Sequence, residues 1–222
     1  MTREEIRELA MKHLAAGDAT GWFDVLYSKA DGDAGSIPWA DLEPNPNLLA
    51  WLDRNPLPAT GRALVVGCGL GDDAEEIARR SPGLKVRAFD IAPNAIAWCR
   101  KRFADSRVDY QVADLLNPPV NFHHAFDFVF ESYTLQALPT NVRKQAIAGV
   151  AGFVAPRGRV LIICRGREPS DPDTGPPWPL TREDLSAFTR EHGLIEQSFE
   201  DFLDPGEDPP ARRFRCVYRR QS

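Results

Sequence analysis

Three glycines at alternate positions stand out in the run GCGLG at residues 67–71. Glycine adopts backbone conformations that other residues disfavour, so Gly67, Gly69 and Gly71 permit a tight turn that passes close to a ligand. Asp90 lies 19 residues beyond Gly71. A carboxylate there can accept hydrogen bonds from both ribose hydroxyls of an adenosine. The pattern indicates a site for an adenosine-containing ligand.

Acidic residues also follow the next two apolar runs. Asp114 is placed to take the amino group of an adenine, and Leu115 to pack on its ring. Glu131 ends the run after that. One acidic residue in such a place is weak evidence, and Asp90 alone could be only the N-cap of the following helix. Each of four consecutive apolar runs is followed by glycines or by an acidic residue, and together these residues are much stronger evidence for a ligand site.

The spacing of the glycines argues against a nicotinamide dinucleotide site. The dinucleotide pattern requires its third glycine at position 72, where this chain has Asp72. A carboxylate at the start of a helix also repels phosphate, whereas it suits a cationic ligand. A nicotinamide oxidoreductase is therefore the weaker alternative.

A parallel sheet would bring these residues together. The predicted strands are residues 63–66, 86–89, 110–113, 126–130, 159–164, 194–202 and 213–218. The predicted helices among them are residues 73–80, 94–103, 141–154 and 181–192. Apolar strands alternating with helices are typical of an α/β, doubly wound, mostly parallel sheet, here of seven strands with an antiparallel C-terminal strand. Such sheets bind ligands beyond the carboxyl ends of their strands.

The chain divides into an N-terminal cap, residues 1–58, and a core, residues 59–222. A capping box of Thr2 and Glu5 predicts a helix at the start. Residues 21–47 look irregular, and residues 48–54 look like a short helix. In the core, the proline-rich loop at residues 166–180 is long enough to close as a lid.

The core resembles the class I S-adenosylmethionine-dependent methyltransferases over about residues 60–165. The resemblance rests on LVVGCGLGDD at residues 64–73, on Asp90 and Asp114, and on FDFVFE at residues 126–131. It implies a Rossmann-like methyltransferase fold, S-adenosylmethionine as cofactor and S-adenosylhomocysteine as product. Cys68 would then contribute its backbone and not a nucleophilic thiol. The cofactor contacts that we expect are Trp22, Trp39, Gly67, Cys68, Gly69, Gly71, Asp90, Ile91, Asp114, Leu115 and Glu131.

Segments outside the core are similar to the thiopurine, thiol and halide methyltransferase superfamily. They are Trp22, IPW at residues 37–39, PNP at residues 44–46, Leu49 and GPPW at residues 175–178. The chain departs from that superfamily at residues 131–133, where ESY replaces the common aspartate and bulky or basic residue. The resemblance implies a small-molecule acceptor, with a thiol as first choice. An O- or N-methyltransferase of a secondary metabolite and a non-catalytic cofactor-binding protein remain alternatives.

Methyl transfer from a sulfonium requires mainly an aligned nucleophile and the exclusion of water. The candidate catalytic residues are Glu131, Tyr133 and Arg165, with Gln136 as a further orienting group and Arg165 able to hold an anionic acceptor. Five aromatic side chains could lie beside the sulfonium or cover an apolar patch: Trp22, Tyr27, Trp39, Tyr133 and Trp178. The histidines at residues 123–124 precede a strand, which places them at the opposite edge of the sheet.

Composition limits the partners of the protein. The net charge of −5 does not favour a nucleic-acid partner. No apolar run approaches the roughly 18 residues that span a bilayer, so we expect no membrane partner. The four cysteines match no zinc pattern, and we predict no metal site. We expect a cytoplasmic monomer or homodimer. Five arginines in residues 212–220 favour the solvated face of an edge strand over a nucleic-acid patch.

Overall fold

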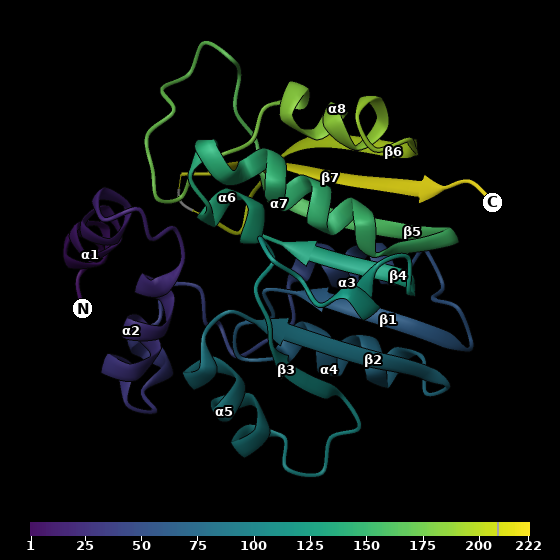
Figure 1. The fold of residues 1–222 in the computed structure, drawn as a ribbon, viewed down its shortest axis with the longest axis horizontal. Helices are drawn as coiled ribbons and strands as arrows, with labels where there is room; N and C mark the ends of the chain where they lie inside the picture. The colour runs from purple at the N-terminus through teal and green to yellow at the C-terminus, as the bar shows by residue number, and fades with distance from the viewer. Residues whose placement is uncertain (208) are drawn as a thin grey trace.

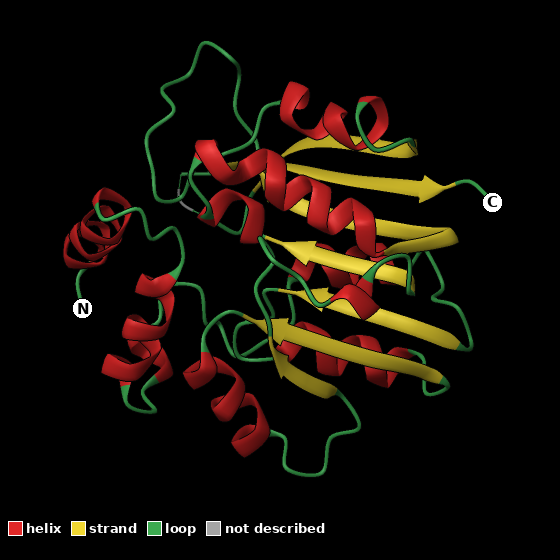
Figure 2. Cartoon of the chain, viewed as in Figure 1, coloured by secondary structure: helices red, strands yellow, loops and turns green. Residues whose placement is uncertain are grey.

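The computed structural model describes residues 1–207 and 209–222. A seven-stranded sheet runs through its centre in the order β3-β2-β1-β4-β5-β7-β6 (Figures 1 and 2). The strands are β1 (Gly61–Val66), β2 (Leu84–Asp90), β3 (Asp109–Val112), β4 (Phe126–Ser132), β5 (Val154–Arg165), β6 (Leu194–Asp204) and β7 (Ala211–Arg220). Strands β1 to β5 are parallel, and β7 runs antiparallel to both of its neighbours. The predicted fold class, including the antiparallel C-terminal strand, is confirmed.

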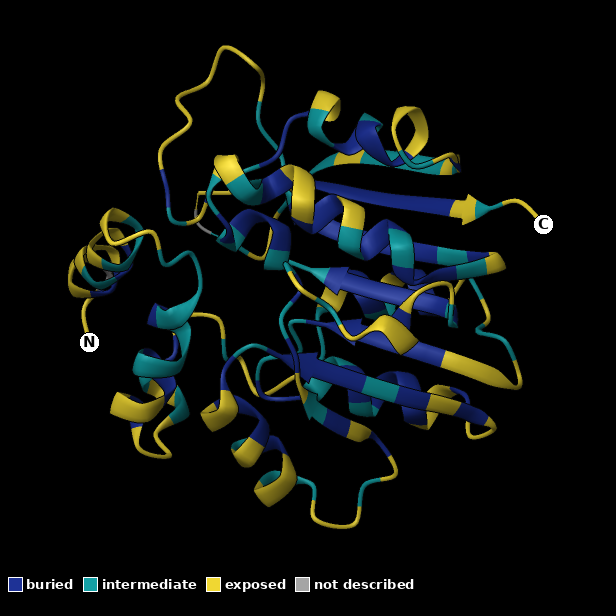
Figure 3. Ribbon diagram, in the orientation of Figure 1, coloured by how far each residue is buried: buried dark blue, intermediate teal, exposed yellow. Residues whose placement is uncertain are grey.

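Helices cover both faces of the sheet. These helices are α3 (Pro46–Leu52), α4 (Asp72–Arg80), α5 (Pro93–Arg102), α6 (Thr134–Ala137), α7 (Thr140–Phe153) and α8 (Arg182–Arg190). Alternate residues of β1 face opposite ways: Leu64 packs with α7 and α8, and Val65 packs with α3, α4 and α5. Both sets of side chains are buried, which explains why the strands read as continuous apolar runs. Figure 3 shows the burial of the central strands.

The N-terminal cap has more helix than the sequence predicts. Helix α1 (Arg3–Ala15) carries the expected capping box, but α2 (Gly21–Ala30) occupies a region that was expected to be irregular. Asp18 accepts hydrogen bonds from the first amides of α2, while Trp22 and Leu26 bury one face of the helix. Because the first helical residue is Gly21, the start of α2 is not recognised from the sequence. The prediction was therefore wrong for residues 21–30.

Helices α1 and α2 of the cap lie beside the carboxyl ends of the parallel strands (Figure 1). Their apolar residues pack with Leu70 of the glycine turn and with Ala92 and Ala95 of α5. Asp24 of α2 accepts hydrogen bonds from the backbone and side-chain nitrogens of Asn94, so it caps α5 from outside the core. The cap is thus joined to the edge of the sheet at which we expect the ligand.

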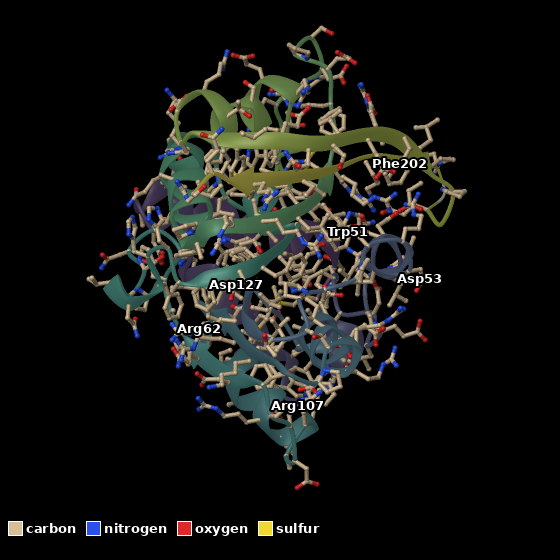
Figure 4. All side chains as sticks on the ribbon, turned by 90° about the vertical axis from the view of Figure 1, so that its right-hand side faces the viewer. Trp51, Asp53, Arg62, Arg107, Asp127 and Phe202 are labelled. Carbon is tan, nitrogen blue, oxygen red and sulfur yellow. The ribbon has the colours of Figure 1, made fainter. Side chains whose placement is uncertain are left out.

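The opposite edge carries contacts that hold strands together. The Asp127 carboxylate accepts a hydrogen bond from the Arg62 backbone at 2.8 Å, which joins β4 to β1. Figure 4 looks onto this edge, where both residues are labelled. His123 and His124 stack on each other just before β4, with their ring centroids 3.9 Å apart. The prediction that this pair lies away from the carboxyl ends of the strands is confirmed.

The C-terminal arginines do not form a solvated edge, which corrects the sequence prediction. Strand β7 lies between β5 and β6, so β6 forms the edge of the sheet. Arg213 and Arg215 are buried, and carboxylates on or next to β6 pair with them. Arg212 pairs with Asp201 and Glu168, while Arg219 and Arg220 donate to backbone carbonyls. Partners within the protein therefore explain these five arginines, and a bound nucleic acid is not needed to account for them.

We expect Arg215→Ala to lower the free energy of unfolding by about 2 kcal/mol, measured by urea denaturation. The change removes charge-assisted bonds to Glu200 and a bond to the Asn47 carbonyl. Arg212→Ala is the control on the same strand. Its side chain is 31% exposed, against 7% for Arg215, and we expect a loss below about 1 kcal/mol. Equal losses would contradict this account of β7.

Candidate active site

The turn after β1 has a backbone that favours glycine. Gly67, Gly69 and Gly71 have φ angles of 57°, 54° and 93°. A Cβ atom on Gly67 would lie 2.2 Å from Oγ1 of Thr134, and one on Gly71 would lie 2.6 Å from the hydroxyl of Tyr110. Inside the turn, Gly71 donates its N–H to the Cys68 carbonyl at 3.0 Å. Gly67 and Gly71 are therefore favoured by both conformation and packing, and Gly69 by conformation.

Asp90 ends β2 and holds this turn in place. One carboxylate oxygen accepts the Gly69 N–H and the other accepts the Ala92 N–H, each at 3.0 Å. Asp90 is not the N-cap of α5, because Ala92 holds that position and donates its own N–H to Asp90. The Ile91 backbone also bonds to this carboxylate, which has about four lone-pair sites, so capacity to accept a ligand hydroxyl remains. Burial raises the pKa of Asp90 to about 6.

The residues after β2 and β3 complete this part of the sheet edge. Asp114 is half-buried and accepts the Leu116 N–H at 2.8 Å, which leaves its other oxygen open to a ligand. Leu115 is buried in the apolar cluster that includes α7. Ile91 is half-buried beside Asp90. The structure thus places Asp90, Ile91 and Asp114 after neighbouring strands, as their chain positions predict.

Asp72 has a different environment from the one that the sequence suggests. Its carboxylate makes two hydrogen bonds with Arg102, at 2.7 and 2.8 Å. Arg102 also donates to the Leu70 carbonyl. Because the charge of Asp72 is neutralised, we correct the expectation that it serves a cationic ligand. It ties α4 and the glycine turn to α5.

Glu131 is fully buried at the end of β4. Its Oε1 accepts the Leu135 N–H at 2.9 Å, which places the carboxylate at the N-terminus of α6. Burial raises its pKa to about 7, and its Oε2 has no hydrogen-bond partner among the described residues. Next to it, Thr134 donates its hydroxyl to the Val66 carbonyl at 3.2 Å. These contacts make Glu131 a residue that positions α6 against the glycine turn.

Tyr133 and Arg165, the other two candidate catalytic residues, lie at the ends of β4 and β5. Tyr133 has a left-handed φ of 64° and donates its N–H to the Ile163 carbonyl. The Arg213 guanidinium lies over the Tyr133 ring, 4.9 Å from its centroid. Arg165 donates its backbone N–H to the side-chain carbonyl of Gln136 and pairs with a carboxylate through its guanidinium.

The aromatic candidates fall into two groups. Trp22 and Trp39 cluster with Phe23 and Tyr27 in the cap, with ring centroids 3.9 to 6.2 Å apart. The Tyr27 hydroxyl accepts a bond from Trp39 Nε1 at 2.8 Å and lies 3.5 Å from where a Cβ on Gly69 would be. Tyr27 therefore lies against the glycine turn, and Trp39 is bonded to Tyr27.

Trp22 is buried in the cap, and its Nε1 has no partner among the described residues. Trp178 is not part of the cap cluster. It is buried where the 166–180 loop meets α6 and α7, and its backbone bonds to Gln136 and Arg143. The loop is thus anchored at Trp178, while residues 168–174 are exposed (Figure 3).

Two groups near the turn were missed as site residues. Asp73 accepts the Asn45 N–H at 2.7 Å, and the Asn45 side chain donates to Ser132 at 2.8 Å, which joins the cap to β4. Cys99 donates its thiol to the Gly69 carbonyl. The PNP run at residues 44–46 was visible in the sequence, but its partners are far away along the chain.

Comparisons with known proteins agree with this geometry. A family model described as "Methyltransferase domain" matches residues 63–158. "Probable thiol methyltransferase 2" of Arabidopsis thaliana is 26% identical over 197 residues, which cover 87% of this chain and 80% of that protein. Trans-aconitate 2-methyltransferase of Variovorax paradoxus is 31% identical over 142 residues, covering 64% of this chain and 49% of that enzyme. The chain thus spans about half the length of this second relative.

Solved structures give the same fold. A phosphoethanolamine N-methyltransferase of Haemonchus contortus, solved with S-adenosyl-L-methionine, has a TM-score of 0.65 at 17% identity. The match covers 89% of this chain and 56% of that one. A structure from work on the conversion of a disulfide bond into a thioacetal group in echinomycin biosynthesis has a TM-score of 0.69 at 22% identity. That match covers 89% of this chain and 92% of the other.

The fold, the site and these matches support the resemblance to the class I S-adenosylmethionine-dependent methyltransferases. The residues present fit S-adenosylmethionine, because Asp90 is a buried carboxylate next to the glycine turn and can accept a ligand hydroxyl. The structure also shows no helix, among the residues it describes, long and apolar enough to cross a membrane.

We expect Gly71→Ala to destabilise the ligand-free protein by about 2 kcal/mol more than Gly32→Ala, measured by urea denaturation. Both glycines have φ near 90°, but a Cβ on Gly32 would meet nothing within 4 Å, whereas one on Gly71 would meet the Tyr110 ring. The difference between the two losses measures the steric clash with Tyr110, because both variants suffer the same strain from a positive φ. Equal losses would show that Tyr110 moves aside freely.

We expect Asp73→Asn to raise the free energy of unfolding by about 1 kcal/mol at neutral pH. Burial raises the pKa of Asp73 to about 6, above its unfolded value of about 3.9. The folded protein therefore takes up this proton first, and its stability falls as the pH rises from about 4 to about 6. Asparagine keeps an acceptor for the Asn45 N–H without the charge.

Urea denaturation of both proteins across this pH range measures the effect. Asp90 and Glu131 contribute equally to the pH dependence of stability in the wild type and in the variant, so their contributions cancel in the difference. We expect the advantage of the variant to vanish below about pH 4. A difference that does not change with pH would contradict the burial of a charged Asp73.

Proposed function

We propose that this protein transfers the methyl group of S-adenosylmethionine to a small-molecule acceptor, most favourably a thiol. Bound cofactor would supply an electrophilic methyl group on a sulfonium. The chain would bind the adenosine, orient the acceptor and exclude water. The observation that carries the choice of a thiol is the complete burial of Glu131, the acidic side chain expected nearest to the acceptor.

A buried Glu131 is poorly placed to remove a proton from an acceptor. Its Oε1 is already bonded to α6, and it has no exposed surface. A thiol needs little help from a base, because a few per cent of it is ionised near neutral pH. Phenols and alcohols need more help from a base. Among acceptors that are neutral in solution, the site as folded therefore favours the thiol, which ionises more easily than a phenol or an alcohol.

The Arabidopsis thaliana relative supports the same choice. Its match covers 80% of that protein and 87% of this chain, so it extends beyond the methyltransferase core. The acceptor is expected to lie among the cap, the end of β5 and the 166–180 loop. Cap segments are therefore more informative about the acceptor than the glycine turn, which serves the cofactor.

We assign roles to the residues as follows. Asp90 would accept the ribose hydroxyls, and Asp114 the adenine amino group, with Ile91 and Leu115 beside the base. The glycine turn with the backbone of Cys68 would hold the methionine part. Tyr27 lies against this turn with Trp39 bonded to it, and the two rings would shield the sulfonium from water.

On the acceptor side, Tyr133 and Arg165 would orient the nucleophile. Glu131 would act through α6. Trp22 supports the aromatic cluster from within the cap. The 166–180 loop would close as a lid about its anchor at Trp178. The division into cap and core, a cytoplasmic location and a monomer or homodimer stay predictions.

An O- or N-methyltransferase is the second candidate. The trans-aconitate methyltransferase of Variovorax paradoxus, named for an acid, is 31% identical to this chain. A panel of thiols, halides, phenols, carboxylates and amines separates the candidates by release of S-adenosylhomocysteine. Release with thiols alone is the expected result. Release only with phenols, carboxylates or amines would overturn the thiol acceptor. If no acceptor causes release but the cofactor binds tightly, a non-catalytic binding protein would be favoured.

We expect Asp90→Ala to weaken S-adenosylhomocysteine binding by about 1–3 kcal/mol, measured by calorimetry, since it removes charge-assisted bonds to the ribose. Asp109→Ala is the control, because Asp109 begins β3 at the opposite edge and pairs with Arg87. The control should bind with unchanged affinity. A folded Asp90→Ala protein with the affinity of the wild type would overturn the assignment of Asp90.

A further inference from the structure

Two arginines face each other across β5 and β7 near the expected acceptor. Arg165 is the last residue of β5, and the antiparallel register pairs it with Arg213 on β7. Both therefore lie at the carboxyl end of β5, at the same edge of the sheet as the glycine turn. The Arg213 guanidinium also lies over the ring of Tyr133, which directly follows β4.

One carboxylate lies between these arginines. Glu207 pairs through Oε2 with Arg165 and through Oε1 with Arg213. Arg213 is only 5% exposed at its side chain, and its second contact, to Asp204, is long at 3.4 Å. Its NH1 nitrogen is buried with no hydrogen-bond partner among the described residues. Leaving a buried charged donor without a partner is unfavourable, so this guanidinium has unused capacity to bind an anion.

Glu207 is attached to the molecule more loosely than the arginines. It lies in the turn between β6 and β7, outside both strands, and its side chain is 35% exposed. Moving it into solvent disrupts no strand pairing. A half-exposed carboxylate that bridges two arginines is replaceable by another carboxylate, because the exchange conserves charge and hydrogen-bond geometry.

We propose that Arg213 and Arg165 form a binding site for a carboxylate group of the methyl acceptor, and that Glu207 occupies this site until the acceptor displaces it. The inference rests on the proposed function and narrows it to acceptors that carry an anionic group. Arg213 supplies the buried, fixed arm, and Arg165 the more exposed arm. The Tyr133 ring holds the plane of the Arg213 guanidinium.

Paired acceptors and three variants test this inference. The acceptors are 3-mercaptopropionate and its methyl ester, which differ in charge. The variants are Glu207→Gln, Arg165→Gln and Arg212→Gln. The first two alter exposed or half-exposed side chains, so the fold should survive. Arg212 is the matched control, because it adjoins Arg213 on β7 but pairs with Asp201 and Glu168.

The preference for the acid over the ester, taken as the ratio of kcat/KM, is the primary readout. Glu207→Gln should raise it about fivefold by removing the competing carboxylate, and Arg165→Gln should lower it about tenfold. Arg212→Gln should leave it unchanged. A ratio that none of the variants alters, or that Arg212→Gln alters as much as the others, would overturn the proposal.

A binding measurement keeps this test separate from the choice of acceptor. Protein saturated with S-adenosylhomocysteine is titrated with 3-mercaptopropionate and with the ester, and no methyl transfer can occur. Tighter acid binding in Glu207→Gln and weaker acid binding in Arg165→Gln would support the anion site even if no thiol is methylated. Equal binding of acid and ester in all proteins would overturn it while leaving methyl transfer to neutral thiols intact.

Discussion

The glycine turn between β1 and α4 is the constraint on which the site depends. Its positive φ angles turn the chain directly above the sheet edge, and neighbouring side chains fill the space that Cβ atoms would need. Asp90 ties the turn to β2, and Arg102 ties it to α5. The apolar interior of the sheet gives this turn a rigid base. A single short turn thus connects the packing of the core to the proposed cofactor site.

The acceptor side is organised by hydrogen bonds at the ends of β4 and β5. Glu131 caps α6, and Gln136 of α6 bonds to the backbones of both Arg165 and Trp178. The base of the loop and the end of β5 are therefore held by the same short helix. Buried polar groups with all or most of their bonds made fix one arrangement of these segments. The burial of Glu131 suits a supporting role and leaves the chemistry to the acceptor.

Much of the fold could be predicted from the sequence, because continuous apolar runs and glycines carry local information. The strands, α4, α5 and α7 follow from those runs, and so do the chain positions of Asp90 and Asp114. Predictions failed where partners are distant along the chain. Helix α2 is stabilised by packing on α5, the arginines of β7 are neutralised by β6, and Asp72 is paired with Arg102. Side-chain charge alone cannot reveal such pairings.

The structure of the protein with bound S-adenosylhomocysteine tests the central claim most directly. The account predicts both ribose hydroxyls within hydrogen-bond distance of the Asp90 carboxylate, the adenine beside Asp114, and the sulfur above the turn at residues 67–71. The bonds from Gly69 and Ala92 to Asp90 should persist. A ligand bound elsewhere, or a ribose that makes no contact with Asp90, would contradict the account.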